Sequence, residues 1–292
     1  MRILVTGKNG QIGRCLVEQL SIMSDITLLA LDRDQLDITD SINVNKVVAE
    51  FIPNIIINAA AYTAVDKAEQ ERELAYAVNR DGPYNLAVAA NNINAMIIHI
   101  STDYVFAGDS VAAYVETDDT EPQSEYGRSK LAGEQAVERA CSRHIILRTG
   151  WAFAEQGHNF VNTMLRLTKT TDTLNVVVDQ FGSPTYAGDI ANAIMIITKQ
   201  LADRNQAYGV YHYSGFPYVS WHAFAEKIFE LALAQGVLKQ SIQVNPVTTP
   251  DYPTPAKRPA NSRLNCQKIN QEFGIVQSDW QAALVRIGQY SR

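Results

Sequence analysis

Short apolar runs recur through the first half of the chain and alternate with segments of helical character. The runs are RILVT (2–6), ITLLALD (26–32), NIIINAA (54–60), AMIIHIST (95–102) and HIILRTGW (144–151). None alternates strictly between apolar and polar residues, as expected of strands that are covered on both faces. The segments with helical patterning between them are 11–21, 41–51, 71–92 and 124–141. This order predicts an α/β fold whose core is a doubly wound parallel sheet with right-handed crossovers.

The second half of the chain has a different organisation. Helical patterns cover 158–170, 189–202 and 220–236, and VYHYSG (210–215) has the character of another buried strand. Five of the ten prolines lie within 245–262, which predicts an extended loop, either a flexible linker or a rigid pocket wall.

The 292 residues suffice for one large domain or two closely joined domains. We expect a dinucleotide-binding domain over 1–150, which 180–214 rejoins. A smaller, mostly C-terminal substrate-binding domain is expected over 151–179 and 215–292, because this part follows a complete α/β unit.

Composition excludes several classes of protein. The formal net charge of −6 argues against a surface that binds nucleic acid. No apolar run approaches the length of a membrane span, and MRILVTG leads directly into a strand without room for a signal peptide. The three cysteines lack metal-ligand or redox spacing, as expected of reduced thiols. We therefore expect a cytoplasmic protein.

The segment VTGKNGQIG (5–13) follows the first strand and opens the first helix, with glycines in the spacing G-x-x-G-x-x-G. Residues without a Cβ let the backbone approach a pyrophosphate, whose charge the helix N-terminus favours. A purely structural glycine turn is the alternative, but the strand–turn–helix context indicates a Rossmann-type dinucleotide site. The residues expected to contact the cofactor here are Gly7, Asn9, Gly10, Gln11, Ile12 and Gly13.

The end of the second strand leaves the choice of cofactor open. Asp32 stands where an acid takes the ribose hydroxyls of NAD, but the adjacent Arg33 is suited to the 2′-phosphate of NADP. Asp37 and Ile38 lie where an adenine edge can be held, although ordinary loop residues account for them equally well.

Small and hydroxyl-bearing residues follow the third and fourth strands. Ala59, Ala60 and Ala61 would let a nucleotide lie against backbone, or would serve tight packing of helix on sheet. Thr102 ends the fourth strand, where ligands of open α/β sheets bind, although a helix N-cap would also account for its hydroxyl.

The stretch EYGRSK (125–130) places Tyr126 and Lys130 one turn apart on the same helix face. A phenol with a pKa near 10 is a weak acid–base group at neutral pH, and a neighbouring ammonium lowers that pKa. A solvated helix face is the alternative, but the helix follows the strand that ends in Thr102. We therefore expect a catalytic pair in which Lys130 tunes Tyr126.

TGxxGxxG, the threonine on the fourth strand and Y-x-x-x-K together resemble the extended short-chain dehydrogenase/reductase family. Within it, the chain resembles most closely the dTDP-4-dehydrorhamnose reductases, which catalyse the last step of dTDP-L-rhamnose synthesis. The similar segments, in order between residues 3 and 264, are NAAAYTAVDKAE, STDYVF, YGRSKLAGE, RTGW, NFVNTMLRL, VVVDQFGSPT and KRPANSRL.

The resemblance implies NADPH- or NADH-dependent reduction of the C4 ketone of dTDP-4-dehydro-β-L-rhamnose to dTDP-L-rhamnose. It implies that Tyr126 protonates the C4 oxygen, that Thr102 hydrogen-bonds the same oxygen, and that Lys130 binds the nicotinamide ribose. The substrate-binding residues that it implies are Thr102, Asp103, Tyr104, Trp151, Gln180 and Arg258. For Trp151 a core position is the alternative, and for Arg258, the expected contact of the diphosphate, a solvated surface position.

Some members of the family bind magnesium through glutamates at a dimer contact. Cys15, Gly188 and Asp189 fall near the matching positions, so the resemblance supports no metal ligand here, and a homodimer stays open. Two other functions are compatible with the sequence: an epimerase or dehydratase acting on another nucleotide sugar, and a non-catalytic regulatory subunit resembling that of methionine adenosyltransferase.

Overall fold

The structure, a computed structural model, describes residues 1–203 and 206–290. Residues 204–205 and 291–292, which fall within the domain ranges expected above, lie outside the described part. The longer helices are α1 (Gln11–Ser21), α2 (Ser41–Phe51), α5 (Gly82–Asn92), α6 (Glu125–Ala140), α7 (Phe160–Leu167), α8 (Ala187–Asp203), α9 (Trp221–Ala234) and α10 (Gln267–Phe273). The shorter ones are α3 (Val65–Ala68), α4 (Arg72–Tyr76), α11 (Trp280–Leu284), η1 (Ala77–Asp81), η2 (Asp103–Val105), η3 (Thr249–Asp251) and η4 (Ile287–Gln289).

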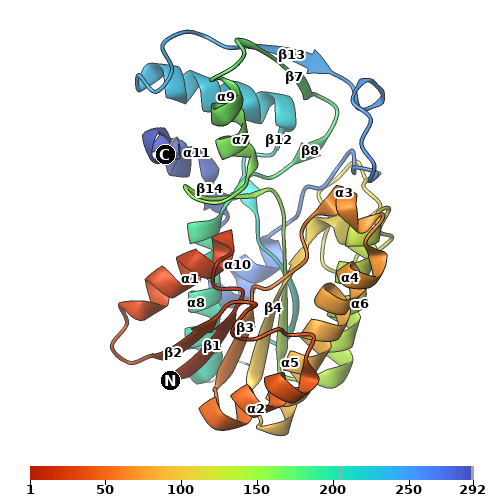
Figure 1. Ribbon diagram of the computed structural model, residues 1–292, viewed down its shortest axis with the longest axis vertical. Helices are drawn as coiled ribbons and strands as arrows, with labels where there is room; N and C mark the ends of the chain where they lie inside the picture. Colours follow the sequence, from red (N-terminus) through yellow and green to blue (C-terminus); the bar gives the residue numbers. More distant parts are fainter. Residues whose placement is uncertain (204–205, 291–292) are drawn as a thin grey trace.

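The main sheet contains six parallel strands in the order β10-β5-β4-β3-β1-β2. They are β1 (Arg2–Thr6), β2 (Thr27–Leu31), β3 (Ile55–Asn58), β4 (Met96–Thr102), β5 (His144–Thr149) and β10 (Gly209–His212). The chain runs outward from β1 to one edge and then to the other, as Figure 1 shows. The prediction of a doubly wound parallel sheet is therefore confirmed.

Helices cover both faces of this sheet (Figure 1). On one face, α1, α8 and α10 pack around a core that includes Ile3, Leu16 and Ile194. On the other, α2, α5 and α6 pack around Leu4 and Ile56. Burial on both sides explains why the strands are apolar throughout. Among the described residues, no helix is both long and apolar enough to cross a membrane.

The segment predicted as one helix over 71–92 is helical from 72 to 92, but a π-helical turn that was not predicted interrupts its α-helical pattern. It is divided into α4, the π-helical turn η1 and α5. Pro83 lies in the first turn of α5, and a proline ring excludes the carbonyl four residues earlier, here that of Asn79. That carbonyl lies against Gly133 of α6, where an added Cβ would be 1.9 Å from the Asn79 oxygen.

A second apolar cluster lies beyond the carboxyl ends of the main strands, at the top of Figure 1. There α7, α9 and α11 pack around Phe153, Phe224 and Trp280. The strand β13 (Gln243–Val247) pairs in parallel with β7 (Thr173–Val177). The expectation of a loop over all of 245–262 is therefore wrong for its first residues. The remaining short strands are β6 (Ala152–Phe153), β8 (Phe181–Gly182), β9 (Thr185–Tyr186), β11 (Gly215–Phe216), β12 (Val219–Ser220) and β14 (Ser278–Asp279).

Candidate active site

A cavity of about 390 Å³ lies where β1, β2 and β3 end. Ten of the residues that the sequence assigns to the cofactor line it: Gly7, Asn9, Gly10, Asp32, Arg33, Asp37, Ile38, Ala59, Ala60 and Ala61. Backbone from two strand ends and a helix N-terminus therefore meets in one depression, as a dinucleotide requires.

The glycine turn is built so closely that side chains are excluded at two of its positions. Gly7 has φ +73°, and an added Cβ would lie 2.5 Å from the Ala60 nitrogen. At Gly13 an added Cβ would lie 2.1 Å from the Gly7 carbonyl oxygen. Gly10 precedes α1 as its N-cap, and no side chain caps that helix terminus. The turn therefore leaves helix N–H groups toward the cavity, and this cradle fits a pyrophosphate.

The acid and the arginine at the end of β2 have different surroundings. The Asp32 carboxylate lies 3.4 Å from the Lys8 ammonium and accepts a hydrogen bond of 3.1 Å from Asn9. The Arg33 side chain is 73% exposed and meets Asp37 only at 3.9 Å. Arg33 is thus free to turn toward a 2′-phosphate, while the charge of Asp32 is partly balanced by Lys8.

Five residues expected at the cofactor do not line this cavity: Tyr126 and Lys130, which belong to the cluster at the end of β4, and Gln11, Ile12 and Gly13 of the glycine turn. The Gln11 side chain turns to the other side of the turn, where its oxygen accepts a hydrogen bond of 2.8 Å from Asn159. Ile12 packs against the apolar core, and Gly13 is covered by the Gly7 backbone. The side chains of Gln11 and Ile12 are therefore not placed to contact the cofactor. Their backbone N–H groups belong to the N-terminus of α1.

Thr102, Tyr126 and Lys130 meet at the carboxyl end of β4. The Lys130 ammonium donates a hydrogen bond of 2.7 Å to the Ile100 carbonyl. The Thr102 hydroxyl donates one of 2.9 Å to the Asp103 carboxylate and lies close enough to Tyr126 to lower the pKa of its phenol in part. Helix α6 begins at the expected place because Ser124 caps it, its hydroxyl accepting from the Gly127 N–H at 3.1 Å. The cap alternative for Thr102 also holds, since its hydroxyl accepts from the Tyr104 N–H of η2.

Burial shifts the pKa of each titratable group in this cluster. It raises the pKa of the Tyr126 phenol, while the Thr102 hydroxyl lowers it in part. It lowers the pKa of Lys130 to about 8, against the charge of Glu134, and raises the pKa of Asp103 to about 6. The expectation that Lys130 lowers the Tyr126 pKa is not met here: desolvation raises this pKa, Asp103 and Tyr104 raise it further, and Lys130 is not among the groups that shift it.

Sequence reasoning missed a polar layer beneath the tyrosine. The Asn79 side chain accepts from the Tyr62 N–H at 2.8 Å and donates to the Ser129 hydroxyl at 3.0 Å. Ser129 donates in turn to the Tyr126 carbonyl at 2.7 Å. Asn79 lies in the π-helical turn η1, and this turn places its side chain between Tyr62 and Ser129. Pro83 was the one signal of the turn in the sequence.

The proline-rich loop closes one side of the site. Arg258 donates a hydrogen bond of 2.7 Å to Asp66 and one of 3.3 Å to the Tyr104 hydroxyl. The Tyr104 ring meets Tyr126 edge to face, with centroids 5.6 Å apart. The Tyr104 side chain therefore connects Arg258 to Tyr126. Arg263, in contrast, donates a hydrogen bond to Asn261.

Two other predicted substrate residues lie farther along the same wall. Trp151 has φ +48° and stacks on Trp221, with ring centroids 3.4 Å apart. Gln180 is buried and donates to Thr249 at 3.1 Å. A non-glycine residue with positive φ is strained, and such strain gathers at functional sites. The core alternative for Trp151 is nevertheless realised in part, because its ring also covers Gly182.

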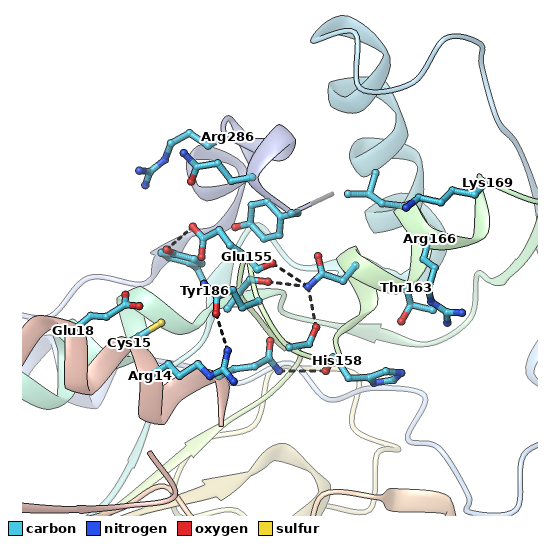
Figure 2. Close-up of a pocket in the computed structure, with 18 residues that line it drawn as sticks. Arg14, Cys15, Glu18, Glu155, His158, Thr163, Arg166, Lys169, Tyr186 and Arg286 are labelled. Carbon is cyan, nitrogen blue, oxygen red and sulfur yellow. Dashed lines mark hydrogen bonds between the residues drawn. The ribbon is translucent and has the colours of Figure 1, made fainter. Parts of the chain in front are cut away.

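A larger cavity, of about 890 Å³, lies between the start of α1 and the segment leading into α7 (Figure 2). Its lining includes Gln11, Cys15 and Glu155, but neither Tyr126 nor Lys130. Burial raises the pKa of the Cys15 thiol to about 12. A protonated thiol is no ligand for magnesium, which takes oxygen. Across residues 1–203 and 206–290, no group of three or more His, Cys, Asp or Glu is placed to hold a metal.

A nucleotide cradle at one half of a parallel sheet and a Thr–Tyr–Lys cluster at the next strand end together define a class. The chain is a Rossmann-type oxidoreductase that uses a nicotinamide dinucleotide.

Comparison with known proteins narrows this class. The RmlD substrate binding domain family matches residues 1–291. A dTDP-4-dehydrorhamnose reductase of Aggregatibacter actinomycetemcomitans is 51% identical over 99% of both chains. The solved dTDP-4-dehydrorhamnose reductases of Clostridium acetobutylicum and of Bacillus anthracis, the latter in complex with NADP, are each 40% identical and cover 98% of both chains, with TM-scores of 0.91 and 0.89. The chain belongs to the dTDP-4-dehydrorhamnose reductase family.

Proposed function

We propose that this protein reduces the C4 ketone of dTDP-4-dehydro-β-L-rhamnose to dTDP-L-rhamnose with NADPH or NADH. The observation that carries the proposal is the placement of Thr102 beside the buried Tyr126 at a strand end of the sheet that also holds the dinucleotide cradle. The names of the relatives, at 40–51% identity over nearly the whole chain, supply the substrate.

The chemistry needs a proton at the C4 oxygen and a polarised carbonyl. Tyr126 supplies the proton, since burial keeps its phenol protonated at neutral pH. The Thr102 hydroxyl orients the same oxygen. When bound, the reduced nicotinamide supplies the hydride for C4. Lys130, charged near neutral pH, binds the nicotinamide ribose.

The substrate contacts are assigned to the wall around Tyr104. Arg258, between Asp66 and the Tyr104 hydroxyl, takes the diphosphate, because a guanidinium presents several donors to phosphate oxygens. We assign contacts with the sugar and the nucleotide of the substrate to Asp103, Trp151 and Gln180.

We further infer that the chain forms two functional units, that the protein is cytoplasmic and that it assembles as a homodimer. The dinucleotide unit covers 1–150 and 180–214, and the substrate unit covers 151–179 and 215–292. Strand β10 in the main sheet and the separate apolar cluster around Phe224 support this division.

The test is a turnover assay with purified protein and dTDP-4-dehydrorhamnose. Loss of absorbance of the reduced nicotinamide is expected with NADPH or NADH, together with formation of dTDP-rhamnose. Cofactor binding without turnover would contradict the reductase and favour the regulatory alternative. Turnover of another nucleotide sugar in its place would favour the epimerase or dehydratase class.

A further inference from the structure

Three consecutive residues of β4 bind to one face of α6. The Ile100 carbonyl accepts from Lys130, the Ser101 hydroxyl donates to Glu134, and the Thr102 hydroxyl lies close enough to Tyr126 to lower the pKa of its phenol in part. On α6 the three partners follow one another at intervals of four residues, so that they lie in one row. Two of them belong to the proposed reaction, and Glu134 has no part in it so far.

Glu134 is a buried carboxylate that is paired with an arginine. Its side chain is 4% exposed, and Arg148 of β5 donates to it at 2.7 Å and 3.0 Å. Arg148 is itself 5% exposed and lies over the Phe106 ring at 5.1 Å. Buried charges are tolerated when they are paired and hydrogen-bonded, and this carboxylate meets both conditions.

We propose that Glu134 is a positioning residue for Lys130: held by Ser101 and Arg148, it keeps the Lys130 ammonium charged and fixed behind Tyr126. The proposal deepens the proposed reduction and rests on it, because Lys130 is the lysine assigned to that reaction. The row on α6 extends Y-x-x-x-K by one further turn.

The electrostatic need for such a group follows from burial. Lys130 is 2% exposed, and desolvation lowers its pKa; with the opposing charge of Glu134 included, that pKa is about 8. Glu134 is the group that raises this pKa. His99 on β4 is buried with a strongly lowered pKa and stays neutral. The other titratable or charged groups on the elements packed against α6 are Asp66, Lys67, Arg72, Glu73, Tyr76, Arg80, Asp81, Tyr84, Asp103, Tyr104, His144 and Arg148.

The first experiment compares Glu134→Gln with Glu138→Gln, which removes the same charge from the exposed side of α6 one turn further on. Turnover is measured from pH 6 to 9. A nearby opposite charge is worth about one pKa unit. The alkaline limb of the pH–rate profile of Glu134→Gln should therefore move to lower pH by about one unit. Glu138→Gln should keep the wild-type limb. Reduced turnover with an unmoved limb in Glu134→Gln would overturn the proposal and leave Glu134 a purely structural role.

A second experiment needs no substrate, so its outcome is separate from that of the proposed function. The folding equilibrium of Glu134→Gln is compared with wild type by urea denaturation across the same pH range. Below pH 7 Lys130 is charged in both folded proteins, and the variant lacks the attraction between the Lys130 ammonium and the Glu134 carboxylate. Above pH 9 Lys130 is neutral in both folded proteins, so this attraction is absent from both. The destabilisation should therefore shrink as pH rises, by about tenfold in the equilibrium constant for each unit of pKa lost. A difference that is constant with pH would overturn the proposal.

If Glu134→Gln alone does not fold, the double variant Glu134→Gln/Arg148→Met removes both buried charges and is measured in the same way. Its destabilisation should again shrink from pH 6 to 9. A double variant with the wild-type pH dependence would overturn the proposal.

Discussion

At the scale of single residues, the site rests on a phenol that burial keeps protonated. The Thr102 hydroxyl stands beside Tyr126, and the Lys130 ammonium is fixed on the Ile100 carbonyl. A tyrosine in this condition can donate a proton to a ketone oxygen but is a poor base. The cluster therefore presents a protonated phenol as the candidate proton donor.

Tyr126→Phe should keep the affinity for NADPH and lose turnover by about 10²- to 10⁴-fold, the usual contribution of a positioned proton donor. Cofactor affinity is measured by titration and turnover by absorbance. Tyr84→Phe, which changes a half-exposed tyrosine of α5, is the control and should leave both unchanged. Turnover near the wild-type level in Tyr126→Phe would show that another group donates the proton.

Arg33→Ala should weaken NADPH by about tenfold and leave NADH nearly unchanged, because only NADPH carries a phosphate for the exposed guanidinium. Dissociation constants of both cofactors measure this difference. Arg139→Ala, an exposed arginine at the far end of α6, serves as the control. An equal loss for the two cofactors would rule out a 2′-phosphate contact of Arg33.

At the scale of elements, the passage from β1 into α1 depends on two glycines for different reasons. Gly13 lies against the Gly7 carbonyl, so that helix and turn share one contact. At Gly10 an added Cβ would be 3.4 Å from the Gly7 oxygen, and its φ of −71° suits alanine. Gly13 is therefore needed for packing, whereas the open space beside Gly10 is left for the ligand.

Gly13→Ala should therefore destabilise the fold by about 1–3 kcal/mol, as overpacking does, whereas Gly10→Ala should leave stability nearly unchanged. Gly10→Ala should weaken the dinucleotide instead, since its methyl group enters the cradle. Urea denaturation and cofactor titration separate the two effects. Equal stability of the two variants would contradict the packing described for Gly13.

The sequence was sufficient for the elements whose burial is simple. Continuous apolar runs identified the five predicted strands of the sheet from 2–6 to 144–151, and Ser124 marked the start of α6. The break at η1 was not predictable, because Asn79 leaves the regular helix to reach Tyr62 and Ser129, contacts that only the folded chain defines.

The same limit applies to side-chain direction in the site. Gln11 belongs to the glycine turn in sequence, yet its side chain binds Asn159, 148 residues away. Glu134 has the character of a solvated helix residue until Arg148 from the neighbouring strand is placed against it. Lys130 was expected to govern the Tyr126 pKa by proximity, but the depth of burial decides it.

At the scale of the whole molecule, the site is closed by contacts between distant parts of the chain. Asp66, near the end of β3, accepts both the Arg258 guanidinium and the Ala256 N–H of the proline-rich loop. The loop thus carries a cation to the wall beside Tyr126. This contact joins the proline-rich loop to the half of the chain that holds the cofactor cradle.

Arg258→Gln should raise the KM for the nucleotide sugar by about ten- to a hundredfold, because a hydrogen bond to a charged group contributes about 1.5–3 kcal/mol. NADPH affinity should stay nearly unchanged. Lys257→Gln is the matched control, since this exposed neighbour contacts only Gln123 among the described residues. A KM unchanged in Arg258→Gln would remove Arg258 from the diphosphate site.

The most direct measurement of the central claim follows the hydrogen itself. The protein is incubated with dTDP-4-dehydrorhamnose and NADPH that carries deuterium at C4 of the nicotinamide on the transferred face, and the product is analysed by NMR. The account predicts dTDP-rhamnose with deuterium at C4 of the sugar. Bound cofactor with no deuterated product, from either face of the nicotinamide, would contradict it.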